Sequence, residues 1–239
     1  MLPRDLILGQ TWAFLASRLR GAKRILEVGC GDAALARHLA SGGLEVTALD
    51  LELTDRSAHR GVRLVEQDFL AFDDVGFDAV LFTCSLHHIA PLETALDRAF
   101  AALNPGGTLL ADEFALEAPD ESTARWYYGM QSLLAGQGMI HADAMHGDPD
   151  APPLERWVAE HRHGVPLHTA EQMLAAITAR FAEVRETTGP FLYRFIASKL
   201  PPTPGAGKLA LKLFEREGEA IRDGRVKAVG RRFSAIRPR

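Results

Sequence analysis

The stretch "RILEVGCGDAALARHLA", residues 24–40, decides the fold. An apolar run with strand character leads directly into a glycine-spaced turn, and a helical pattern follows the turn. The spacing Gly29-x-Gly31-x-x-Ala34 is typical of turns that bring backbone N–H groups close to a nucleotide-containing ligand at a helix N-terminus. The sequence therefore predicts a strand, a ligand-binding turn and a helix, in that order.

The same alternation continues along the chain. Further apolar runs of strand length occupy residues 45–50, 62–68, 77–83 and 107–114. Helical patterns and turns separate these runs, which indicates crossover connections. We therefore expect an α/β fold, a Rossmann-like doubly wound sheet whose faces are covered by helices.

Two of the crossovers are expected to be helices. Asp32 can cap a helix over 33–40 that Gly42 and Gly43 end, and 92–103 is an amphipathic helix stopped by Asn104-Pro105-Gly106-Gly107. The connections 51–61 and 69–76 are too short for full helices, so we expect loops or single turns there.

The remaining segments complete a single domain over 1–239. An amphipathic helix is expected in 1–23, and the β/α rhythm breaks at 115–168, which we interpret as an inserted helical lid or substrate segment. A helix with a capping-type start begins near Thr169.

The end of the sheet is expected to be antiparallel. The runs 181–188 and 191–200, joined by Gly189-Pro190, read as a hairpin, which gives seven mostly parallel strands with an antiparallel last strand. Residues 205–239 read as a basic C-terminal extension whose interleaved apolar residues favour an amphipathic helix against the domain or a subunit partner.

Composition narrows the class of protein. The 239 residues carry a formal charge of -4, which argues against a general nucleic-acid-binding surface. Cys30 and Cys84, the only cysteines, support neither a disulfide framework nor a cysteine zinc site, so a cytoplasmic protein is expected. The N-terminal segment has no apolar core long enough for a membrane span.

Charge discriminates between the ligands that the glycine turn could take. Asp50 ends the second strand at the spacing expected of a ribose-binding carboxylate, which fits both a nicotinamide dinucleotide and an adenosine-containing sulfonium. A pyrophosphate would face Glu27 and Asp32, a repulsion that a helix dipole worth about 0.3–1 kcal/mol does not clearly offset. Asp50 and Glu52 also disfavour a 2′-phosphate, and the tyrosines lack the Tyr-x-x-x-Lys spacing of short-chain dehydrogenases. A cationic, phosphate-free ligand is favoured.

At this point the chain resembles a known family. The motifs "ILEVGCGDA", Asp50, "EQDFLAF", "FDAVLFTCSLHHI" and "LNPGGTLLADEF" are similar, in order and spacing, to those of class I S-adenosylmethionine-dependent methyltransferases, close to the small-molecule branch called methyltransferase type 11. The resemblance covers roughly residues 23–114. Ala33 departs from it, since many relatives have a third glycine there, and should narrow the turn without blocking it.

The resemblance implies a cofactor, S-adenosylmethionine, and the residues that hold it. Glu27, Gly29, Cys30 and Gly31 would surround its methionine part. Asp50 would bind the ribose, and Leu51 would flank the adenine. Asp68 would meet the adenine amino group, with Phe69 packing beside the ring. Backbone contacts after the fourth strand would come from Thr83, Cys84 and Ser85.

Catalytic candidates lie at the carboxyl edge of the expected sheet. His87 and His88 follow the fourth strand, where one of them could act as a general base, and packing histidines are the competing interpretation. Glu113 ends the fifth strand, and only one of Asp112 and Glu113 should face the pocket because strand side chains alternate.

The insertion offers two further sets of candidates. Trp126, Tyr127 and Tyr128 could clamp an acceptor or build core. The segment 141–150 is rich in His and Asp, but it lacks a third fixed ligand, so we predict no metal site and interpret it as an acidic loop.

The leading hypothesis is methyl transfer from S-adenosylmethionine to a small molecule by in-line displacement. Two alternatives stay open: an RNA or protein methyltransferase that docks through 205–239, and a non-catalytic cofactor-binding subunit. We expect a small-molecule acceptor, no membrane and no nucleic-acid partner, and a homo-oligomer is left open.

Overall fold

The computed structural model describes residues 1–141, 148, 150–161 and 167–239. The chain divides into two compact units, each assembled from separate stretches. Unit 1 comprises 1–10, 114–166 and 188–230, and unit 2 comprises 11–113, 167–187 and 231–239. None of the described helices is both long enough and apolar enough to span a membrane.

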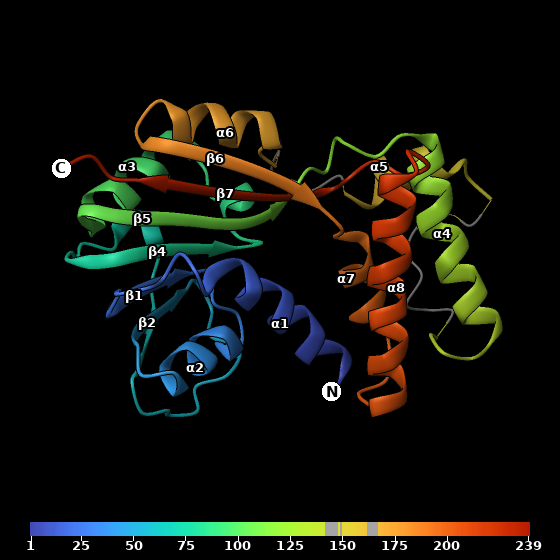
Figure 1. Ribbon diagram of the computed structural model, residues 1–239, viewed down its shortest axis with the longest axis horizontal. Helices are drawn as coiled ribbons and strands as arrows, with labels where there is room; N and C mark the ends of the chain where they lie inside the picture. The colour runs from blue at the N-terminus through green and yellow to red at the C-terminus, as the bar shows by residue number, and fades with distance from the viewer. Residues whose placement is uncertain (142–147, 149, 162–166) are drawn as a thin grey trace. The chain divides into compact units, whose positions relative to one another are not determined.

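A seven-stranded sheet forms the framework, in the order β3-β2-β1-β4-β5-β7-β6. Its strands are β1 (Arg24–Val28), β2 (Glu45–Asp50), β3 (Val62–Glu66), β4 (Phe77–Thr83), β5 (Leu103–Phe114), β6 (Ala182–Gly189) and β7 (Gly230–Ile236). The pairs β1–β2, β1–β4, β2–β3 and β4–β5 are all parallel. β7 runs antiparallel to β5, as the arrows in Figure 1 show. The predicted Rossmann-like, mostly parallel sheet is therefore confirmed.

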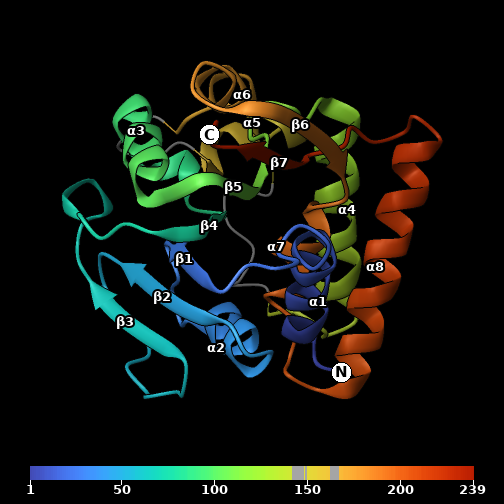
Figure 2. The same ribbon diagram turned by 60° about the vertical axis from the view of Figure 1, so that its left-hand side comes forward.

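Helices cover both faces of the sheet in unit 2. Figure 2 shows α3 (Leu92–Ala102) and α6 (Ala170–Thr178) over one face and α2 (Ala34–Ser41) over the other. Central strands such as β1 and β4 are mostly apolar because both of their faces are buried. The connection after β3 holds only a 3-10 turn, η1 (Phe69–Ala71), as its length predicted.

The predicted helix starts need one correction. α6 begins with a capping box in which Thr169 and Gln172 exchange hydrogen bonds, as expected. At α2, however, the N-cap is Ala33, in the left-handed region at φ 54°, and not Asp32. Asp32 still accepts a hydrogen bond from the Ala34 N–H, at 3.0 Å, because its short side chain folds back over the turn.

The predicted hairpin over 181–200 is wrong. The first half is β6, but residues 192–197 form a helix, α7 (Leu192–Ala197). The strand that lies beside β6 is β7, which comes from the basic C-terminal segment. The apolar run of α7 was too short for its periodicity to separate a buried helix from a strand.

Unit 1 is a helical body. It contains α4 (Glu121–Gly136), α5 (Pro153–Glu160), α7 and α8 (Pro204–Arg222), and α1 (Pro3–Leu15) begins in it. The segment predicted as an inserted lid supplies α4 and α5. Tyr127, Trp157, Phe191 and Phe195 pack together in its core, with ring centroids 5.4–6.3 Å apart.

Candidate functional site

The turn after β1 has the backbone that its glycines predicted. Gly29 and Gly31 both have positive φ, at 75° and 54°. A Cβ on Gly29 would lie 2.4 Å from the Cβ of Ser85, so only glycine fits there. A Cβ on Gly31 would meet no atom within 4 Å, so the space over this turn is open.

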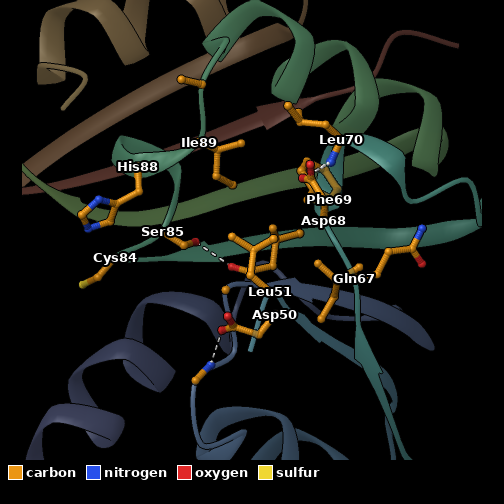
Figure 3. A pocket seen from close by; sticks show the side chains of 15 residues that line it. Asp50, Leu51, Gln67, Asp68, Phe69, Leu70, Cys84, Ser85, His88 and Ile89 are labelled. Carbon is orange, nitrogen blue, oxygen red and sulfur yellow. Dashed lines mark hydrogen bonds between the residues drawn. The ribbon is translucent and has the colours of Figure 1, made fainter. Parts of the chain in front are cut away.

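A hollow of about 410 Å³ opens at this turn, at the carboxyl ends of the parallel strands. Figure 3 shows Asp50 and Leu51 from the end of β2 facing the loop after β4, which carries Cys84, Ser85 and His88. The hollow is lined by Val28, Gly29, Gly31, Leu49, Asp50, Leu51, Gln67, Asp68, Phe69, Leu70, Cys84, Ser85, His88, Ile89 and Ala90. No lysine or arginine is among these residues, which suits a ligand without phosphate.

Most of the predicted cofactor residues line this hollow, and three of them do not. Glu27, Cys30 and Thr83 lie outside its lining, whereas Gln67, Leu70, Ile89 and Ala90 line it without having been predicted. The missed residues are neighbours of predicted ones along the chain; the apolar character of Leu70, Ile89 and Ala90 could have indicated them, whereas nothing in the sequence pointed to Gln67. Leu51 is 72% exposed, a large apolar side chain left open at a strand end.

Two aspartates of the hollow are held by backbone N–H groups. Asp50 Oδ2 accepts from Gly31 at 2.8 Å and Oδ1 accepts from Glu52 at 3.3 Å. Asp68 caps η1 by accepting from Leu70 at 2.9 Å. Each carboxylate oxygen keeps a second lone pair, so both groups can still accept hydrogen bonds from a ligand.

Glu27 is a buried carboxyl beneath the turn. Its side chain is 2% exposed, and burial, reinforced by Asp32 and Asp50, raises its pKa to about 8. Among the described residues, Oε2 has no hydrogen-bond partner. Burial likewise raises the pKa of the nearby Cys30 thiol to about 12, so that thiol is not a nucleophile at neutral pH.

Glu113 organises the loop after β4. Oε1 accepts from the backbone N–H groups of Ser85, at 2.9 Å, and Leu86, at 2.7 Å, and Oε2 lies 2.7 Å from His87 Nδ1. Both Glu113 and His87 are buried, at 0% and 3% exposure. These predicted catalytic residues are therefore brought together, but neither lines the hollow.

His88 differs from His87 both in its exposure and in its contact with the hollow. It is exposed and lines the hollow, with its ring centroid 4.1 Å from that of His87. Cys84, at the start of the same loop, is also exposed and has φ 56°. Of the predicted catalytic residues, His88 alone is placed to reach a molecule in this hollow.

Asp112 and Glu113 point to opposite sides of β5, as the alternation predicted. Asp112 accepts from the Thr11 hydroxyl at 2.8 Å and pairs with Arg232 Nε at 3.0 Å. Both side chains are buried.

The aromatic candidates of the insertion belong to the core of unit 1. Tyr127 and Tyr128 are 2% and 5% exposed, Tyr128 donates to Glu160 at 2.7 Å, and Trp126 packs against the same cluster half-buried. None of the three lines the hollow of unit 2. Most of the His/Asp-rich segment, 142–147 and 149, lies outside the described residues.

The residues of the hollow fit an adenosine-containing sulfonium. Gly31 leaves open space for close approach of the backbone, Asp50 offers acceptors for ribose hydroxyls, and Leu51 and Phe69 offer apolar surface to a base. Beneath the turn and outside this lining, Glu27 has a buried oxygen without a partner among the described residues, an acceptor that a cationic group would satisfy. The surroundings are acidic, which favours positive charge.

Comparisons with known proteins agree with this geometry. The family described as "Methyltransferase domain" matches residues 4–147. An uncharacterized methyltransferase of Mycobacterium bovis is 35% identical over 115 residues, which cover 45% of this chain and 57% of that protein. The matched region thus spans about half the length of such curated relatives.

Solved structures show the same fold. Phosphoethanolamine N-methyltransferase 2 of Haemonchus contortus, in complex with S-adenosylmethionine, superposes with a TM-score of 0.60 at 18% identity, covering 97% of this chain and 53% of that one. The 1,6-didemethyltoxoflavin N1-methyltransferase of Burkholderia thailandensis has a TM-score of 0.55 at 18% identity, covering 97% and 78%. The family match, which spans more than half of the chain, settles the assignment: this protein belongs to the class I S-adenosylmethionine-dependent methyltransferases.

Proposed function

We propose that the protein transfers the methyl group of S-adenosylmethionine to a small-molecule acceptor by in-line displacement. The observation that carries the proposal is the acidic hollow of unit 2, lined by no lysine or arginine, in which the open Gly31 turn meets Asp50. The structural neighbours are named for phosphoethanolamine and didemethyltoxoflavin, which supports a small molecule as the acceptor class.

The cofactor supplies a methyl carbon that is already activated by its sulfonium. In an in-line displacement the acceptor's lone pair would form a bond to that carbon while the carbon–sulfur bond breaks, and the electron pair of the broken bond would stay on sulfur. Most of the rate enhancement then comes from alignment and exclusion of water. We assign Asp50 and Asp68 to the adenosine end of the hollow and Glu27 to the methionine end.

A base is required only when the acceptor has a proton to lose. His88 is the candidate because it is exposed into the hollow, whereas His87 is buried against Glu113. We assign His87 and Glu113 to positioning the loop 84–89, which lines the hollow, and not to contact with the acceptor.

The direct test is cofactor binding by an Asp50→Ala variant. Loss of the ribose acceptors and of the Gly31 hydrogen bond should weaken S-adenosylhomocysteine binding by about 10- to 100-fold, the equivalent of one or two charge-assisted hydrogen bonds. Calorimetric titration measures it, and Asp73→Ala, an exposed aspartate outside the hollow, is the matched control. Equal affinity of the Asp50 variant and the wild type contradicts the assignment.

The acceptor class is tested separately. Methyl transfer from labelled cofactor into a metabolite extract from which macromolecules have been removed supports a small molecule. Label appearing only in RNA or protein overturns that part of the proposal, and no transfer to any fraction, with cofactor binding intact, points to a non-catalytic subunit.

The structure weakens the case for docking through the basic segment 205–239. Several of its cations are engaged within the fold: Arg216 with Glu219, Arg225 with Asp223, Arg231 with Glu186 and Arg232 with Asp112. The segment also supplies β7, so deleting it would remove a strand of the sheet. Salt dependence of RNA binding by the whole chain is the better test.

A further inference from the structure

A second hollow, of about 310 Å³, lies in unit 2 where the chain after α1 approaches β5, β6 and β7. It shares no lining residue with the cofactor hollow. Arg185 and Glu183 line it from alternate positions of β6, and Ser234 and Ile236 from alternate positions of β7. The complete lining is Ser17, Arg18, Thr108, Glu183, Arg185, Ser234, Ala235 and Ile236.

Arg18 is held in place at the edge of this hollow. Its Nη1 donates to the Phe14 carbonyl at 2.7 Å, and its guanidinium carbon lies 4.5 Å from the centre of the Phe14 ring. Arg232 lies over the same ring at 5.4 Å and is neutralised by Asp112. Within the part of the chain that the structure describes, neither Arg18 nor Arg185 has an ion pair.

The two unpaired guanidinium groups repel each other. Burial lowers the pKa of Arg18, and the charges of Arg232 and Arg185 lower it further. A bound anion would relieve this repulsion. Guanidinium groups match the oxygens of phosphate in a two-point geometry, and an ammonium group does not.

The other polar groups of the hollow favour a small phosphate ester over a polyanion. Ser17, Thr108 and Ser234 offer hydroxyl donors to further phosphate oxygens. Glu183 places one carboxylate in the same hollow, where it would repel a second phosphate and could accept a hydrogen bond from a hydroxyl group of the ligand. The volume lies at the lower end of the range of small-molecule sites, roughly 300–1,000 Å³.

We propose that this hollow binds a small phosphate monoester through Arg18 and Arg185, separately from the cofactor site. The phosphoryl group would sit between the two guanidinium groups, and Glu183 would limit the ligand to one phosphate. The inference does not depend on the proposed methyl transfer, because none of its residues belongs to the cofactor hollow.

The test is calorimetric titration of the full chain, saturated with S-adenosylhomocysteine, with inorganic phosphate and with glycerol 3-phosphate. We expect one site per chain, tighter for the ester than for inorganic phosphate. Arg185→Gln and Arg18→Gln should each weaken binding by about tenfold, the loss of one charge-assisted contact at a partly exposed site. Glu183→Gln should strengthen binding, because it removes a repelling charge.

The controls separate this site from general surface charge. Arg20→Gln removes an exposed arginine outside the hollow and should leave phosphate binding unchanged. Binding that is absent at millimolar phosphate and ester, or equal in all variants, overturns the proposal. The proposal is also overturned, in favour of a macromolecular partner, if a single-stranded RNA or an acidic peptide binds through the same arginines more tightly than glycerol 3-phosphate does.

Discussion

At the residue scale, Glu27 gives the cofactor site a dependence on pH. Its raised pKa, about 8, leaves the carboxyl mostly protonated at neutral pH, because burial disfavours the charge. A cation bound beside it favours the carboxylate and so lowers that pKa. Binding of the cofactor beside Glu27 is therefore expected to release a proton from this carboxyl group.

The carboxylate form of Glu27 is the form that favours a bound cation, so cofactor affinity should depend on pH. Affinity for S-adenosylmethionine should rise as pH increases towards about 8, by at most about tenfold per pH unit, and should level off above it. Titrations in buffers of different ionisation enthalpy measure the proton released. Glu27→Gln should abolish the Glu27 contribution, and an unchanged proton release in that variant would falsify this role.

Glu113 is expected to affect cofactor binding through the loop 84–89, which it holds in place. In Glu113→Gln, the oxygen can still accept from Ser85 and Leu86, but an NH₂ group replaces the acceptor that faces His87. We expect cofactor affinity to fall by about tenfold, part of a hydrogen-bond loss of roughly 1–3 kcal/mol. Titration with S-adenosylhomocysteine measures it.

Asp112→Asn is the matched control for Glu113→Gln. Asp112 is the preceding residue of β5, equally buried and equally engaged, but its partners are Thr11 and Arg232 on the opposite face. The Asp112→Asn variant should have a lower thermal stability than the wild type, without a comparable change in cofactor affinity. Equal losses of affinity in both variants would mean that Glu113 has only a structural role.

At the scale of elements, Glu217 joins two helices of unit 1. It lies on α8, is fully buried, and accepts hydrogen bonds from the N–H groups of Phe191, Leu192 and Tyr193 at 2.6–2.9 Å, at the start of α7. These are donors that a helix start cannot satisfy internally. Burial raises the pKa of Glu217 to about 7.

Removing this carboxylate should destabilise unit 1. Glu217→Ala leaves three buried donors unpaired and should cost about 3 kcal/mol or more in free energy of unfolding. Urea denaturation measures the loss, and Glu215→Ala, an exposed residue of the same helix, should be nearly neutral. If the two variants are equally stable, Glu217 does not hold α7.

The pKa of Glu217 also predicts how pH affects this contact. A carboxyl whose pKa is raised takes up a proton on folding, so its contribution favours folding most at low pH and is lost as pH rises through about 7. Between pH 4.5 and 7, stability should therefore fall less with rising pH, or rise more, in Glu217→Gln than in the wild type.

At the scale of the whole molecule, the part of the sheet that was predictable is the part whose strands carry local signals. β1, β2 and β4 are short, mostly buried segments rich in apolar residues and next to glycines or turns, so their pattern alone identified them. β7 was missed because half of its residues are polar, and its partners lie far away in the sequence. Such pairing depends on tertiary context, which a single sequence does not display.

The residues of the candidate site also differ in whether the sequence alone could identify their roles. Gly29, Gly31 and Asp50 follow strand ends at fixed spacing, so they could be assigned from the sequence. The difference between His87 and His88 could not, because it depends on the direction in which each side chain leaves a short 3-10 turn, η2 (Leu86–His88). The core position of Trp126, Tyr127 and Tyr128 could not be assigned from the sequence either, because they pack against helices distant in sequence.

The position of β7 between β5 and β6 has a consequence for synthesis. A ribosome releases β6 well before β7, so until Ile236 has emerged, β5 and β6 have no strand between them. Their unpaired backbone groups are a template for pairing with other chains during that interval. Slow translation or early termination beyond α8 should therefore expose nascent chains to aggregation, even though every residue that lines the cofactor hollow lies within 28–90.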